Sequence, residues 1–134
     1  MRETNWDDCL ANKLAKSVTP DVNRAESLIE TANERISLIK EITKKNCNFV
    51  FEDYYTSILE LLQAITFKDG YNILNHICLG FYLKEVLKRD DLYILFDDIR
   101  YKRNSLTYYG SRMDYETAKQ AIEKCKKIIK EINS

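Results

Sequence analysis

The residues best able to do chemistry gather in one short run in the second half of the chain. The run holds three arginines, an asparagine and two tyrosines, namely Arg100, Arg103, Asn104, Tyr108, Tyr109 and Arg112. Guanidinium groups bind phosphate, an amide can read the edge of a base, and tyrosine rings offer stacking faces. The run therefore predicts an RNA- or nucleotide-binding site. The alternative is a basic helix end whose tyrosine rings only cover a helical bundle.

Arg103 stands out because of where a helix would place it. At roughly 100° per residue, Arg103 lies about 40° around from Ile99 and in line with the apolar stripe that continues to Leu106. An arginine on such a stripe must pair with an acid, reach a cleft or face a second subunit, because an unpaired buried guanidinium is costly. Asp97 and Asp98 are the nearby acids with which it could pair.

Helices are the elements predicted to position this run. The chain has only three Gly and one Pro, so it holds few chain breakers. Apolar residues recur at spacings of three and four, which is typical of amphipathic helices. The segments with this pattern are about residues 19–46, 49–67, 71–88, 90–110 and 114–132. Because short connections favour antiparallel neighbours, we predict an all-α fold, an antiparallel up-and-down bundle of four to five helices.

Residues at the ends of these segments support the boundaries. Thr19 is the predicted N-cap of the first helix, Asp90 or Asp91 that of the fourth, and Asp114 that of the fifth. Gly110 is suited to the left-handed residue that ends the fourth helix. The third segment is apolar nearly all round, which indicates a helix that is central to the core or that also meets a partner chain.

Length and composition fit one globular domain. The chain has 134 residues, of which 45% are hydrophobic and 31% charged. We expect residues 19–134 to form the domain and residues 1–18 to be an N-terminal extension with a short helix, whose packing the sequence leaves open. The 21 Lys and Arg balance the 21 Asp and Glu, so the net charge is zero. This balance excludes a protein that coats duplex nucleic acid.

The cysteines give no sign of a metal site. Cys9, Cys47, Cys78 and Cys125 are widely spaced and His76 is the only histidine, so we expect neither a metal nor a cofactor. The polar, acidic start is unlike a secretory signal, and no apolar run approaches the ~20 residues that span a bilayer. We therefore expect a cytoplasmic protein without membrane contact, whose reduced thiols act as small hydrophobic groups.

The run from Lys102 to Gly110 resembles the signature of HEPN domains, nucleotide-associated helical domains named from higher eukaryotes and prokaryotes. Many members carry an arginine, then a polar residue that is often asparagine, then a histidine a few positions later, with a tyrosine two residues after it. Earlier segments resemble the preceding helical hairpin of many archaeal and bacterial members, namely residues 60–64, 68–71 and 75–76. The amphipathic helix from Asp114 fits as well, so the resemblance covers roughly residues 20–132.

The resemblance implies a homodimer in which like faces pack together and two arginine motifs share one cleft, where active members cut RNA without a metal. Arg103 would be the phosphate-binding arginine and Asn104 the polar residue beside it. Tyr108 stands where histidine is expected. A phenol with a pKa of about 10 is a poorer general base at neutral pH than an imidazole near 6.5. We expect His76 to be a packed, hydrogen-bonded residue and not a replacement base.

Three functions remain open at this point. The first is a non-catalytic RNA- or nucleotide-binding module, alone or paired with a minimal nucleotidyltransferase, as HEPN proteins often are. The second is a divergent, metal-independent ribonuclease of the toxin type, with Arg103 and Tyr108 as catalytic candidates. The third is an interaction protein whose arginine motif supports only the dimer interface. The missing motif histidine favours the first.

Overall fold

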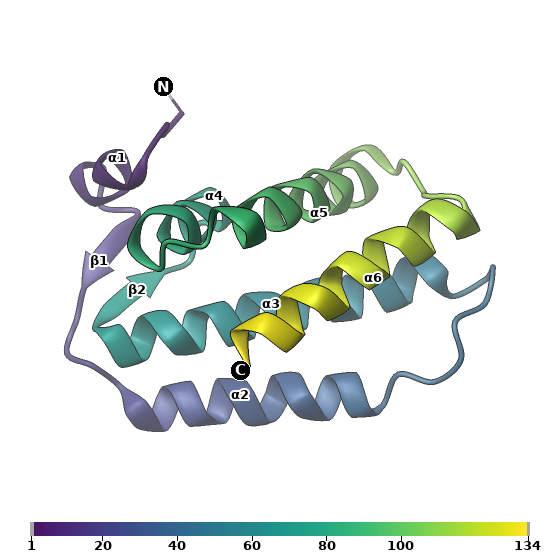
Figure 1. Cartoon of the computed structure of the whole chain (residues 1–134), viewed down its shortest axis with the longest axis horizontal. Helices are drawn as coiled ribbons and strands as arrows, with labels where there is room; N and C mark the ends of the chain where they lie inside the picture. Colours follow the sequence, from purple (N-terminus) through teal and green to yellow (C-terminus); the bar gives the residue numbers. More distant parts are fainter. Residues whose placement is uncertain (1, 134) are drawn as a thin grey trace.

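The computed structural model describes residues 2–133 and consists of helices packed around one long central helix (Figure 1). The central helix is α3 (Cys47–Asp69), which packs against α2 (Val22–Ser37), α5 (Asp90–Tyr109) and α6 (Tyr115–Ile132). The shorter elements are α1 (Trp6–Ala11), β1 (Ala15–Ser17), β2 (Tyr71–Ile73), α4 (His76–Phe81) and the π-helical turn η1 (Tyr82–Val86). The predicted all-α class is confirmed in its coarse form, with a small two-stranded sheet added at one end.

Helix α3 is central because apolar side chains cover most of its circumference. Its buried large side chains are Val50, Phe51, Tyr54, Tyr55, Ile58, Leu61, Leu62 and Phe67. Burying each such side chain contributes roughly 1.5–3 kcal/mol. Helix α3 ends at Gly70, whose φ of 88° and lack of a side chain allow the backbone of Val18 to pass close by. Despite the apolar character of α3, no helix within the described residues is long and apolar enough to cross a membrane.

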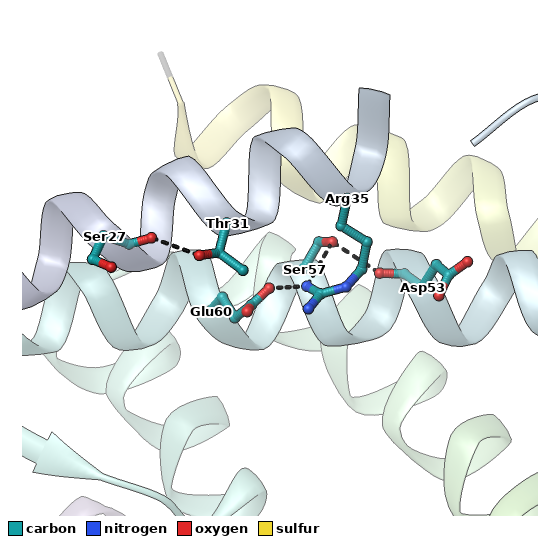
Figure 2. Close-up of polar contacts among 6 residues, drawn as sticks. All are labelled: Ser27, Thr31, Arg35, Asp53, Ser57 and Glu60. Atoms are coloured by element: carbon teal, nitrogen blue, oxygen red, sulfur yellow. Dashed lines mark hydrogen bonds and ion pairs between the residues drawn. The ribbon is translucent and has the colours of Figure 1, made fainter. Parts of the chain in front are cut away.

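Helix α2 is held on α3 by a polar network that the two helices share (Figure 2). Arg35 on α2 forms an ion pair with Glu60 on α3 and donates to the Ser57 hydroxyl, 3.5 Å away. Ser57 is fully buried, and its own hydroxyl donates to the backbone carbonyl of Asp53 at 2.9 Å. The polar groups therefore satisfy one another, which allows a buried serine in an otherwise apolar seam.

Helices α5 and α6 form the hairpin that carries the basic run. Gly110 ends α5 in the left-handed conformation, with φ of 65°. The side chain of Asp114 caps α6 by accepting the backbone N–H of Thr117 at 2.8 Å. Both predicted boundaries are confirmed. Asp98 on α5 binds Lys124 on α6 at 2.8 Å, which adds an ion pair to the apolar contact between the two helices.

The first long helix is shorter than predicted. Asp21, and not Thr19, is its N-cap, because the backbone before it is drawn toward the end of α3: the N–H of Asp21 donates to the carbonyl of Phe67 at 3.0 Å. The helix ends at Ser37, well before Asn46. Asn46 instead closes a local turn, with its side chain accepting the backbone N–H of Thr43 at 2.6 Å. Local bonds of this kind compete with a continuing helix.

The predicted helix over residues 71–88 is wrong in its first part and in its regularity. The chain forms β2 first, and Asn75 then caps α4 by accepting the N–H of Cys78 at 3.0 Å. Beyond α4 the helix widens into the π-helical turn η1. Strand β2 pairs antiparallel with β1, with Lys16 opposite Asn72. The partner strand is far away in the sequence, so local periodicity could not reveal it.

The N-terminal extension packs on the core. The short helix predicted there is confirmed over Trp6–Ala11, after which the chain turns into β1. The Trp6 ring meets the edges of Tyr71 and Tyr82, with centroids 5.4 and 5.2 Å away. Its backbone N–H donates to the Glu85 carboxylate at 2.9 Å. Aromatic packing and strand pairing therefore fix this segment against α4 and η1.

A disulfide between Cys9 and Cys78 joins α1 to α4, with Cα atoms 5.9 Å apart. The expectation of four reduced thiols is wrong for this pair, because the fold brings together cysteines that lie far apart in the sequence. Cys47 and Cys125 are free and buried, as small hydrophobic residues. Burial raises the pKa of the Cys125 thiol. Disulfides are uncommon in a reducing cytosol, so this bond weighs against the cytoplasmic location, which stays a prediction.

Candidate functional site

A groove between the start of α4 and the second half of α5 combines part of the predicted basic run with two other segments. Its volume is about 290 Å³, and it is lined by Arg2, Asn75, His76, Ile77, Arg100, Asn104 and Tyr108. We refer to it as the α4–α5 groove. Its lining offers cations, amides, an imidazole and a phenol, and it includes no carboxylate.

Helix α5 presents one of its faces to the groove. Arg100, Asn104 and Tyr108 are four residues apart, and residues at this spacing lie one above the other on a helix. Helix α4 approaches α5 closely at Gly80, where a Cβ atom would lie 3.4 Å from the ring of Phe96. This close approach sets the first residues of α4 beside the polar face of α5.

Arg100 is the buried cation of the groove. Only 6% of its surface is exposed, and Asp97 binds its Nη2 at 2.8 Å and its Nε at 3.2 Å. The guanidinium carbon lies 4.6 Å from the ring centroid of Tyr101. Burial lowers the pKa of Arg100, but the hydrogen bond and charge of Asp97 raise it further than burial lowers it. A permanent positive charge is therefore held in a fixed place at the groove wall.

His76 lies in the same groove, and Tyr55 fixes its ring. The Tyr55 hydroxyl and His76 Nδ1 share a hydrogen bond of 3.1 Å, while the Tyr55 ring stacks on Phe96. His76 Nε2 has no hydrogen-bond partner within residues 2–133 and is not sealed from solvent. Burial, followed by the positive charges of Arg103 and Arg100, lowers the pKa of His76. The lowered pKa favours the neutral form of the imidazole at pH 7.

Arg103 lies behind the groove and is not part of its lining. The side chain is half-buried, and its guanidinium carbon is 5.7 Å from the ring centroid of Tyr55, within cation–π range. The bridge to a nearby acid is not formed: Asp97 pairs with Arg100, Asp98 pairs with two lysines, and Arg103 has no ion pair in the described part of the chain. The positive charge of Arg103 acts on Tyr55 and on His76, and His76 lines the groove.

The remaining predicted residues separate in space. Tyr108 is 69% exposed and lies at the rim of the α4–α5 groove, so its ring is accessible for stacking. Tyr109 is exposed but does not line the groove. Arg112 lines a different cavity of about 370 Å³, which it shares with Asp98 and Lys102. The structure thus unites only half of the predicted set, Arg100, Asn104 and Tyr108.

Sequence reasoning missed four groove residues: Arg2, Asn75, His76 and Ile77. His76 is packed and hydrogen-bonded, as expected, but it also faces the site. Asn75 could have been recognised as a helix cap, which would have ended the predicted long helix and placed His76 at a helix start. No signal in the sequence pointed to Arg2, because its place depends on how the N-terminal segment packs.

Comparisons with protein-family models, curated proteins and solved structures find no match to this chain. The resemblance to HEPN domains therefore rests on sequence motifs alone, and the structural support for a function comes from the groove. Among the described residues, no group of three or more His, Cys, Asp and Glu side chains could hold a metal ion.

Proposed function

We propose that this protein is a non-catalytic, HEPN-like module that binds RNA or a nucleotide in the α4–α5 groove. The observation that carries the proposal is the meeting of the buried cation Arg100 with Asn104, Tyr108 and the neutral imidazole of His76. Arg100 suits a phosphate, the Asn104 amide suits a base edge, and the exposed Tyr108 ring suits stacking on a base.

The charge of the groove supports an anionic ligand. Arg2 and Arg100 line it, Arg103 adds its charge from behind Tyr55, and the lining includes no Asp or Glu. Asp97 neutralises part of the Arg100 charge but also fixes the orientation of its guanidinium. A preorganised guanidinium loses little entropy when it binds a phosphate, which supports Arg100 as the phosphate-binding residue.

We further propose that the protein is a homodimer that uses the exposed face of α5. Ile94 and Tyr101 are 62% and 54% exposed and lie seven residues apart, which places them on one helix face, with Tyr108 at the end of this face beside the groove. This apolar stripe leads to the groove rim, so pairing two copies of it would bring two grooves together. A minimal nucleotidyltransferase seated there is the alternative partner. A monomeric mass by light scattering at micromolar concentration would contradict the homodimer.

A direct binding measurement tests the function. We expect Asn104→Ala to weaken binding of fluorescein-labelled single-stranded RNA by roughly fivefold, since a net hydrogen bond is worth about 1 kcal/mol. The neighbouring Ser105→Ala is the matched control, because Ser105 is on the same helix but outside the groove. Equal affinity of both variants and the unmodified protein, by fluorescence anisotropy, would refute the proposal.

Metal-independent RNA cleavage is the second candidate, and His76 is the observation that favours it. A neutral imidazole beside Arg100 could accept the proton of a ribose 2′-hydroxyl while the guanidinium stabilises charge on the phosphate. Labelled RNA incubated with the protein and a chelator distinguishes the two functions. Cleavage that His76→Gln and Arg100→Lys both abolish would replace the binding module with a ribonuclease, whereas intact RNA supports the binding module.

A further inference from the structure

A second cavity adjoins the α4–α5 groove on the side of the two-stranded sheet. Its volume is about 200 Å³, and it is lined by Lys13, Leu14, Lys16, Asn72, Leu74 and Asn75. We call it the ribbon cavity, because β1 and β2 form much of its wall. Asn75 lines both the ribbon cavity and the α4–α5 groove, so the two depressions meet at this residue.

The two lysines of the ribbon cavity, Lys13 and Lys16, are cations without an acidic partner among the described residues. Within residues 2–133 neither Lys13 nor Lys16 takes part in an ion pair. Their backbone is nevertheless well fixed. Lys16 pairs with Asn72 across the ribbon, and Lys13 has a left-handed φ of 60° at the turn before β1. The backbone that carries the two ammonium groups is thus fixed, and Asn75 joins their cavity to the groove that Arg100 lines.

Asn72 supplies an observation that the fold alone does not explain. Its side-chain Oδ1 is buried and has no hydrogen-bond partner in the described structure. Buried polar atoms are nearly always paired, so a donor that reaches this acceptor, from a water molecule or from a ligand beside the cavity that Asn72 lines, would satisfy it. The N–H groups of a base and the hydroxyl of a ribose are donors of this kind.

From these observations we propose that the ribbon cavity and the α4–α5 groove form one track for a single-stranded RNA several nucleotides long. Arg100 and Arg2 meet one phosphate, and Lys13 and Lys16 meet phosphates further along the strand. Asn72 accepts a hydrogen bond from the nucleotide between them. The inference rests on the proposed function and deepens it, because it selects an oligonucleotide over a mononucleotide as the ligand.

The test compares a labelled dinucleotide with a labelled dodecanucleotide, using the full chain. Lys13→Gln combined with Lys16→Gln should weaken dodecanucleotide binding by about tenfold and leave dinucleotide binding unchanged. The slope of log affinity against log salt should become shallower by about 1.4, since each phosphate contact on a single strand contributes about 0.7. The matched control is Lys127→Gln with Lys130→Gln, which removes two exposed charges from α6.

The outcomes separate the track from the groove. Equal loss with both lysine pairs, or no loss with the first pair, overturns the track while dinucleotide binding still supports the proposed function. Absence of binding of either RNA by the unmodified protein overturns both. Asn72→Leu provides a second arm: unchanged thermal stability with weaker dodecanucleotide binding supports the track, and unchanged binding contradicts the role of Asn72.

Discussion

Two arginines on opposite sides of the central helix show how the same side chain serves packing in one place and suits recognition in another. Arg35 lies between α2 and α3, where Glu60 and Ser57 take up its hydrogen bonds (Figure 2). Arg100 is more deeply buried, yet it lies at the wall of an open groove. Its neighbours there include Asn104 and His76, which line the same groove.

The difference lies in how the charges balance. On the α2 side, one cation meets one carboxylate, so the two charges balance. On the α4 side, Arg2 and Arg100 line the groove together with His76, and the charge of Arg103 also acts on His76. Asp97 is the one carboxylate bound to these cations in the described chain. Surplus positive charge beside a groove attracts an anionic ligand. Variants on the α2 side and on the α4 side should therefore differ in their effects on stability and on binding.

The largest expected effect concerns the covalent link on the groove side. Cys9→Ala combined with Cys78→Ala should lower the free energy of unfolding by about 3 kcal/mol, since a disulfide constrains the unfolded chain. Denaturant melts with and without a thiol reductant measure it. A protein equally stable under both conditions would contradict the link. Cys47→Ala is the control, because its stability should respond to the reductant as the unmodified protein does.

Removing the closed pair should affect stability and leave binding alone. Arg35→Met should lower the free energy of unfolding by about 1–2 kcal/mol, because it leaves the Glu60 carboxylate without its partner. Water reaches part of this carboxylate, which limits the loss. RNA affinity should stay within experimental error. Chemical denaturation and anisotropy on the same sample give both numbers, and a binding defect in this variant would erase the contrast between the two sides.

The reverse pattern is expected at Arg100. Arg100→Lys keeps the charge but loses the planar geometry that holds Asp97 and, in the proposed site, a phosphate. We expect RNA binding to weaken by roughly tenfold, about 1.4 kcal/mol, with a smaller loss of stability. Arg35→Lys is the matched variant on the other side. If Arg35→Lys impairs RNA binding as much as Arg100→Lys does, the result would contradict the α4–α5 groove as the binding site.

The smallest effect is a pH dependence from His76. Its pKa is lowered in the folded protein, so the unfolded chain binds more protons once the pH falls below the ordinary value near 6.5. The contribution of His76 to the free energy of unfolding should therefore be constant above about pH 6.5. It should decrease as the pH falls from there toward the lowered pKa of the folded state. Melts of the unmodified protein and His76→Gln across this window measure the difference. Parallel curves would show that His76 is not held neutral by its surroundings.

The sequence predicted the helical class and two helix ends well. The predicted cap of the fourth helix, Asp90 or Asp91, is wrong, because the N-cap of α5 is Arg89 and no side chain caps that end. Asp114 and Gly110 act locally, through a side chain or backbone conformation within a few residues, so their roles could be read directly. The ribbon could not be predicted, because the strand pairing of Lys16 with Asn72 joins distant segments. The disulfide between Cys9 and Cys78 was hidden for the same reason.

The candidate site was predicted on one side only. The spacing of Arg100, Asn104 and Tyr108 marks a single face of α5, which the sequence shows without help. The opposite wall depends on where α4 starts, and the predicted long helix concealed the cap at Asn75. The apolar neighbours of His76 in that long helix predict a packed residue, and they do not show that it also lines the groove.

The disulfide also divides the chain into a covalently closed loop and the segment that follows it. Residues 9–78 form a covalent loop that contains α2, α3 and the α4 wall of the groove, while Arg100 and the rest of α5 lie beyond it. Only non-covalent contacts hold the second wall against the first. Partial unfolding of the α5–α6 hairpin would thus separate the two walls of the proposed binding site, while the disulfide keeps residues 9–78 joined in one loop.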